Sequence, residues 1–164
     1  MRRSSAPPVR RRGLLAAALA LGLLCGLALS GCKTVDKIRM KTLGVSVCEP
    51  AEETAEWVIM EALLAGKTDS REKGWERLQA VLHTSERSPA ALRSWNEMVY
   101  PRLRRQADHY LDGDGCFRLV NFREMQNGGI DFYVESHRKE MPTPCSVYAD
   151  GDQGGRWRIK RCSL

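Results

Sequence analysis

Cysteines are the residues of this 164-residue chain with the clearest chemistry. Cys25 lies in an apolar run, and Cys32 ends the sequence Leu29-Ser30-Gly31-Cys32. The other four are spread over the rest of the chain: Cys48, Cys116, Cys145 and Cys162. None belongs to a Cys-x-x-Cys pair, so neither a zinc site nor thioredoxin-type redox chemistry is supported. Four dispersed cysteines instead favour two disulfides, provided that the chain is exported to an oxidising compartment.

The other residues that carry chemistry do not form a catalytic or metal-binding pattern. His83, His109 and His137 lie in three different predicted elements, and none has a second ligand at metal-binding spacing. The Asp112-x-Asp114 motif lacks the later ligands of a calcium loop, so we interpret it as a turn. Neither a nucleophile elbow nor a phosphate-binding loop is present. We therefore expect no catalytic residue, no metal and no cofactor.

The first 29 residues have the organisation of an export signal. Five arginines and no acidic residue lie between positions 2 and 12, and an apolar run then extends from Gly13 to Leu29. A basic segment followed by such a run is typical of a secretory signal peptide. The run has 17 residues, which is close to the lower limit for a transmembrane helix. Length alone therefore leaves a retained membrane anchor open, and the residues that follow the run decide between the two.

Leu29-Ser30-Gly31-Cys32 resembles the lipobox of bacterial lipoproteins, in which a branched residue and two small residues precede a cysteine. The small residues suit the narrow cleft of a signal peptidase. The resemblance implies cleavage between Gly31 and Cys32 and a thioether-linked diacylglyceryl group on the Cys32 sulfur. Arg11-Arg12-Gly13-Leu14-Leu15 also resembles a twin-arginine export motif. It lacks the preceding Ser or Thr, so ordinary secretion is favoured.

These assignments divide the chain into three parts. Residues 1–31 are the predicted signal peptide, residues 32–47 a lipidated tether that could end in a short extended piece at residues 45–47, and residues 48–164 a single domain. The resemblance implies that the N-terminal lipid binds the protein to a bacterial membrane. If the host has two membranes, Lys33 in place of Asp after the acylated cysteine is the pattern of the outer membrane, with the domain on its periplasmic face.

Removal of the signal peptide also changes the charge of the chain. The formal net charge of +6 includes the five arginines that precede the cleavage site. The mature chain keeps 21 basic and 20 acidic residues, so its net charge is about +1. A strongly basic chain would suggest a nucleic-acid partner, but a nearly neutral one does not, and no such partner is expected.

The first half of the domain has helical periodicity. Pro50 and the acidic residues around it predict the start of a helix that ends at Gly66. A second helix is predicted from the capping residue Asp69 to Leu82. A third is predicted to begin at Ser88-Pro89, and Pro101 is expected to kink or break it.

The second half has the patterns of strands and turns. Apolar runs or alternation predict strands over residues 116–125, 130–134, 145–149 and 157–162, with Asn127-Gly128-Gly129 as a hairpin turn. Residues 141–144 are predicted to form a loop. The fold class is therefore α+β, with three N-terminal helical segments packed on a four-stranded antiparallel meander that could curve into a roll.

This order of elements is similar to the cone-shaped α+β roll of the nuclear-transport-factor-two-like superfamily. The similarity rests on two helices, which include residues 57–67 and 75–82, and on a last strand with the sequence Gly155-Arg156-Trp157-Arg158-Ile159-Lys160. It implies a cone that holds a ligand in some members. The pocket would be lined by Trp57, Trp75, Trp95 and Tyr133, and other polar groups that could face it are Asp108, Tyr110, Asp131 and Tyr148. The alternative, which we favour, is that the tryptophans form a packed core.

The last predicted hairpin gives two conflicting arguments about the disulfides. A symmetric turn places Cys145 opposite Cys162, which leaves Cys48 to pair with Cys116. Matching the apolar residues, Val147 with Ile159 and Ala149 with Trp157, shifts the register by one residue and turns Cys162 to the other face. We favour the Cys145–Cys162 pairing, and both arguments stay open at this point.

Two functions follow from these patterns. The first is a membrane-anchored extracytoplasmic lipoprotein without catalytic activity, whose domain binds an envelope protein or another envelope component. The second is a pocket-bearing roll that binds or converts a small apolar molecule. The residues leave the oligomeric state open.

Overall fold

The computed structural model of the protein describes residues 44–164. The predicted signal peptide, the predicted cleavage site at Gly31 and the predicted acylation site at Cys32 lie outside these residues. The described part contains the helices α2 (Ala55–Lys67), α3 (Arg71–Ala80), α4 (Pro89–Ser94) and α5 (Tyr100–Gln106). Its strands are β1 (Val45–Val47), β2 (Phe117–Glu124), β3 (Gly129–Val134), β4 (Thr143–Asp150) and β5 (Arg156–Cys162).

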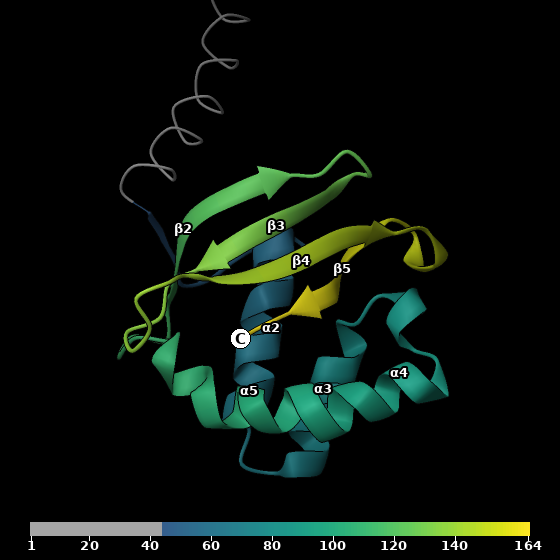
Figure 1. Ribbon diagram of the computed structural model, residues 1–164, viewed down its shortest axis with the longest axis horizontal. Helices are drawn as coiled ribbons and strands as arrows, with labels where there is room; N and C mark the ends of the chain where they lie inside the picture. Colours follow the sequence, from purple (N-terminus) through teal and green to yellow (C-terminus); the bar gives the residue numbers. More distant parts are fainter. Residues whose placement is uncertain (1–43) are drawn as a thin grey trace, which may run out of the picture. The chain divides into compact units, whose positions relative to one another are not determined.

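The strands form one antiparallel sheet in the order β1-β2-β3-β4-β5, so every strand pairs with its neighbours along the chain. The helices lie on one side of this sheet (Figure 1). α2 packs against β4 and β5 and also against α3 and α5. The predicted α+β class and the antiparallel meander are confirmed.

The prediction of four strands was wrong, because the sheet has five. The additional strand is β1, where Val45 pairs with Leu119 and Val47 with Phe117. Sequence analysis placed these three residues at the end of the tether. A three-residue strand is too short to show an alternating pattern, and its edge position depends on pairing with a strand that lies about 70 residues later.

Capping side chains stand at the start of α2, α3 and α4. Thr54 accepts a hydrogen bond from the Trp57 backbone N–H, Ser70 from that of Lys73, and Ser88 from that of Ala91. The cap at Ser88 was predicted, but the first two helices begin later than expected from Pro50 and Asp69. In both cases a hydroxyl residue further along the chain caps the helix.

Gly66 does not end the first helix, as sequence analysis predicted, but lies inside α2. A Cβ atom at this position would lie 2.9 Å from the Cβ of Ala107 and 3.0 Å from the carbonyl oxygen of Leu103. Gly66 therefore allows the close approach of α2 and α5.

The helix that contains Pro101 continues through the proline. A π-helical turn, Trp95–Val99, joins α4 to α5, and the Tyr100 N–H bonds to the Trp95 carbonyl. Proline has no N–H to donate to the preceding turn, and a π-turn of this kind is one way in which a helix absorbs such a defect. The helix therefore widens locally at this turn, where a kink or break was predicted.

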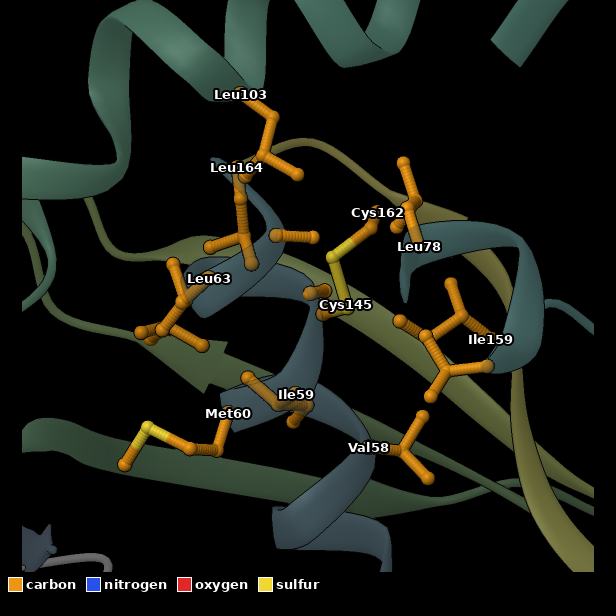
Figure 2. Packing of buried hydrophobic residues seen from close by; sticks show 14 of the residues in the cluster. Val58, Ile59, Met60, Leu63, Leu78, Leu103, Cys145, Ile159, Cys162 and Leu164 are labelled. Atoms are coloured by element: carbon orange, nitrogen blue, oxygen red, sulfur yellow. A yellow bond between two sulfur atoms is a disulfide. The ribbon is translucent and has the colours of Figure 1, made fainter. Parts of the chain in front are cut away.

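The hydrophobic core fills the space between the helices and the sheet. Val58, Ile59 and Leu63 of α2 are fully buried there. Figure 2 shows them near the Cys145–Cys162 disulfide and Ile159 of the sheet, with Leu78, Leu103 and Leu164 close by. Burial of this apolar surface is the main force that holds the helices on the sheet.

Candidate functional site

The sheet has one face toward the helices and one face that points away from them, here called the outer face. Along β3, Phe132 and Val134 belong to the hydrophobic core. Side chains alternate along a strand, so Asp131 and Tyr133 lie on the outer face. Asn121, Arg123, Pro144 and Arg161 also lie there and are exposed to solvent.

Four polar residues form a row across the outer face, one from each of four neighbouring strands. Arg123 of β2 pairs with Asp131 of β3, Asp131 with Ser146 of β4, and Ser146 with Arg161 of β5. We call these four residues the polar row. Neighbouring strands lie about 4.8 Å apart, so the long arginine side chains at the two ends can reach toward the carboxylate between them.

Asp131 forms the floor of the row. Its carboxylate accepts a hydrogen bond of 2.6 Å from the Ser146 hydroxyl and one of 2.7 Å from the Arg123 guanidinium. Burial opposes the negative charge of Asp131, but the bonds from Ser146 and Arg123 outweigh it and hold the pKa of the carboxyl below its usual value. Asp131 is therefore ionised at neutral pH.

A hollow of about 270 Å³ lies over the row. Its lining adds three residues from the neighbouring positions of the strands to the four of the row: Tyr133, Pro144 and Ser163. Two guanidinium groups and one carboxylate give this hollow a net charge of +1. Such a surface can attract an anionic group, because charge complementarity raises the local concentration of a ligand of opposite sign.

Arg161 is the least engaged cation of the hollow. Within residues 44–164 its side chain makes no hydrogen bond and no ion pair. Arg123 donates to Asp131 through one nitrogen, Nη2. An arginine side chain has five N–H donors in a planar fork that matches a carboxylate, so most of the donors of the two side chains remain available.

The residues of the predicted pocket do not surround one cavity. Trp95 is buried, and its indole N–H donates to Glu86 over 3.2 Å. Trp57 and Trp75 are partly buried against the core. Tyr133 lies on the opposite side of the sheet, at the hollow. The three tryptophans thus pack with the core, whereas Tyr133 belongs to the outer face.

The other polar candidates are also dispersed. Asp108 pairs with Lys67 at 3.1 Å, and the buried Tyr110 hydroxyl bonds to Thr143 and Lys139. The ring of Tyr148 lies under the ammonium group of Lys160, 4.5 Å from its centroid. Of the five polar groups named from the sequence, Asp131 and Tyr133 are the two that meet at the hollow.

Sequence analysis missed Arg123, Ser146, Arg161 and Ser163. The predicted hairpin turn contained a signal for Arg123. In a hairpin centred on Asn127, residues at equal distances before and after Asn127 pair with each other. Arg123 and Asp131, four residues on either side, are such a pair. Arg161 had no comparable signal, since its register depends on an irregularity between β4 and β5.

That irregularity reconciles the two arguments about the last hairpin. Val147 pairs with Ile159 and Ala149 with Trp157, as apolar matching predicts, and Cys145 nevertheless pairs with Cys162. The register shifts between Ser146 and Val147, which is a β-bulge with one additional residue on β5. Both premises were therefore right, and the assumption of a single register was wrong.

The structure has two disulfides, Cys48–Cys116 and Cys145–Cys162. Both pairings agree with the favoured connectivity. Disulfides of this kind are typical of proteins outside the reducing cytoplasm, so they indicate an extracytoplasmic environment.

One histidine lies near a buried carboxylate, as in some catalytic sites. The His83 Nε2 atom is 3.9 Å from Asp150 Oδ1. Asp150, however, accepts bonds of 2.8 Å from both the N–H and the hydroxyl of Thr84 and from the Gln153 amide. These contacts tie the residues after α3 to the β4–β5 hairpin, which is a structural role.

Among residues 44–164, no group of three or more His, Cys, Asp or Glu side chains could hold a metal ion. No helix in this range is long and apolar enough to cross a membrane.

Comparison of the chain with protein-family models, curated proteins and solved structures finds no match. The similarities to the lipobox and to the nuclear-transport-factor-two-like roll therefore rest on the sequence patterns alone.

Proposed function

We propose that the protein is a bacterial lipoprotein, anchored to a membrane through a lipid on Cys32, whose extracytoplasmic α+β domain binds an envelope protein or another envelope component without catalysing a reaction. The observation that carries the proposal is the agreement of two independent features. The N-terminal 32 residues have the order of a lipoprotein signal, and the domain contains two disulfides.

A binding role is supported by the exposed polar hollow on the outer face. A polar hollow with two arginines suits contact with a charged group of another molecule better than enclosure of a small apolar one, since small-molecule sites are mostly apolar. In a host with two membranes, Lys33 favours the periplasmic face of the outer membrane. The alternative function, a pocket for a small apolar ligand, gains no support from the tryptophans, which pack with the core.

The proposal is tested by intact-mass analysis and membrane fractionation of the wild type beside Cys32→Ala. The wild type should fractionate with membranes, begin at Cys32 and carry the mass of attached acyl chains. Cys32→Ala should lose the acyl mass and should not be cleaved at the Gly31–Cys32 bond. Cys25→Ala is the matched control, because the same change in the apolar run leaves the lipobox intact and should leave the acyl mass unchanged.

A wild type without an acyl increment, together with equal membrane retention of the wild type and Cys32→Ala, would exclude the lipoprotein function. The binding part is tested separately by chemical cross-linking in intact envelopes. Recovery of the protein without any cross-linked partner would count against it.

A further inference from the structure

We propose that the polar row on the outer face is a binding site for the carboxylate groups of an acidic peptide, and that it is the surface through which the protein holds its partner. This inference rests on the proposed function and adds the chemistry of the partner.

The hollow has hydrogen-bond donors for an anion at its rim. Arg161 is exposed and makes no hydrogen bond or ion pair in the described part of the chain. Arg123 is held in place by its bond to Asp131 and keeps its other nitrogens free of any such bond. A guanidinium group binds a carboxylate through two parallel N–H···O bonds. The pair thus offers one arginine that is already bonded to Asp131 and one that makes no hydrogen bond within residues 44–164, at opposite ends of one row.

The charge of the hollow favours a ligand with one negative charge. Two guanidinium groups stand against one carboxylate, so one bound carboxylate makes the hollow neutral. A doubly charged phosphate would bring a second negative charge near Asp131, and that charge would have no cation left in the row. The Ser146 hydroxyl does not compete for the ligand, because it donates to Asp131 over 2.6 Å. The balance of charges therefore favours a carboxylate.

The size of the hollow and the cation near it favour a peptide over a single small molecule. Its volume of about 270 Å³ is below the range of about 300–1,000 Å³ that is usual for drug-sized ligands, so it suits one side group of a polymer. A second cation, Lys160, lies on the same face and contacts the ring of Tyr148. An extended peptide with several carboxylates can meet Arg161 and Lys160 together, which a single small carboxylate cannot.

The experiment uses the purified mature protein with its lipid and both disulfides, in a nonionic detergent. Isothermal titration measures binding of hexaglutamate that is acetylated and amidated at its ends, with hexaglutamine as the neutral control. We expect hexaglutamate to bind and hexaglutamine to bind at least about tenfold more weakly. Arg161→Gln should weaken hexaglutamate binding about tenfold, because it removes a charge-assisted bond, and Lys160→Gln should weaken it about threefold.

The matched control is Arg105→Gln, which removes the same charge from an exposed position on α5, on the helical side of the molecule. It should leave binding within about twofold of the wild type, since exposed charges at a distance are screened. Thermal melting verifies that each variant is folded. Arg161 makes no hydrogen bond within residues 44–164 and acts on Asp131 only through its charge, so its replacement should change the melting temperature little.

Three outcomes would overturn the inference. The first is equal binding of hexaglutamate and hexaglutamine to the wild type. The second is an equal loss of binding in Arg105→Gln and Arg161→Gln, which would indicate attraction by overall charge. The third is complete displacement of hexaglutamate by inorganic phosphate at equal concentration, which would make the row a phosphate site. None of them changes the acyl mass on Cys32, so failure of the inference and failure of the proposed function are distinguishable.

Discussion

At the scale of single residues, two buried carboxylates have different surroundings and therefore different roles. Asp131 accepts a hydrogen bond from one charged group, Arg123, and lines a hollow that solvent reaches. Asp150 is fully buried, and its hydrogen bonds come from the neutral groups of Thr84, Asp152 and Gln153. A carboxylate that is saturated by neutral donors has little left for a ligand, so Asp150 stabilises the fold and Asp131 shapes the site.

Asp150→Asn should lower the free energy of unfolding at neutral pH by about 2–3 kcal/mol. Asparagine has one carboxamide oxygen in place of two carboxylate oxygens, so its NH2 group must face a donor. That donor is the Asp152 N–H at the Oδ1 position, or the Thr84 and Gln153 groups at the Oδ2 position. Either orientation leaves a buried donor unpaired and removes the charge of the acceptor. Urea unfolding followed by circular dichroism measures the effect. Asp152→Asn is the control, because the same change two residues away is exposed and should cost less than about 0.5 kcal/mol. Equal losses in both variants would contradict the role of Asp150.

The same variant tests a pH dependence. Burial opposes the charge of Asp150, yet the bonds from the Thr84 N–H and hydroxyl outweigh it and hold the pKa of Asp150 below its usual value. Since the folded state has the lower pKa, the stabilisation is complete above the unfolded value of about 3.9. It is lost as the pH falls through the folded value. The difference in the free energy of unfolding between the wild type and Asp150→Asn should therefore become smaller below about pH 4.

At the scale of elements, the helical layer depends on two glycines where backbones come close. Gly74 of α3 is the more constrained, because a Cβ atom there would lie 2.5 Å from the carbonyl oxygen of Ala65 and would also meet the hydroxyl of Tyr100. The Tyr100 hydroxyl donates to the Arg71 carbonyl over 3.0 Å. Gly74 thus lies where α2, α3 and the start of α5 converge.

Gly74→Ala should lower the free energy of unfolding by about 1–3 kcal/mol. Inside a helix, Gly→Ala usually raises the free energy of unfolding by about 0.5–1 kcal/mol. The sign of the measured change therefore shows whether the close contacts at Gly74 prevent a side chain there. Gly113→Ala is the control, since nothing lies within 4 Å of a Cβ atom at that position, and it should change stability by less than about 0.5 kcal/mol. Thermal melting of both variants provides the comparison, and a higher melting temperature for Gly74→Ala would show that the helices can move apart.

The elements also show how far the sequence predicts the fold. Local signals were sufficient for the hairpin turn at residues 127–129 and for the cap at Ser88, because both depend on neighbours in sequence. An extended piece at residues 45–47 was expected, but its pairing with β2 and the β-bulge near Ser146 could not be found in this way, since both depend on partners in other strands. The candidate site shares this property. Asp131 and Tyr133 were among the named polar residues, but the row appears only when four strands are in register.

At the scale of the whole molecule, the two disulfides link parts of the chain that differ in sequence separation. Cys48–Cys116 closes a separation of 68 residues and ties β1 to the start of β2. Cys145–Cys162 closes 17 residues within the last hairpin. The loss of unfolded-state entropy at these lengths corresponds to about 4 and about 3 kcal/mol. Both values are large beside the whole stability of a small domain, about 5–15 kcal/mol.

Reduction of the folded protein with dithiothreitol should therefore remove most of its stability. In urea unfolding the midpoint should fall sharply for the wild type, and the double variant Cys48→Ala/Cys116→Ala should lose more than Cys145→Ala/Cys162→Ala, because its bridge closes the longer loop. An unchanged midpoint after complete reduction, verified by mass, would mean that the core alone holds the fold. If the midpoint falls as expected, the domain is stable only where its cysteines are oxidised. Such a domain would reach its folded state after export, which agrees with the proposed secretion signal in residues 1–31.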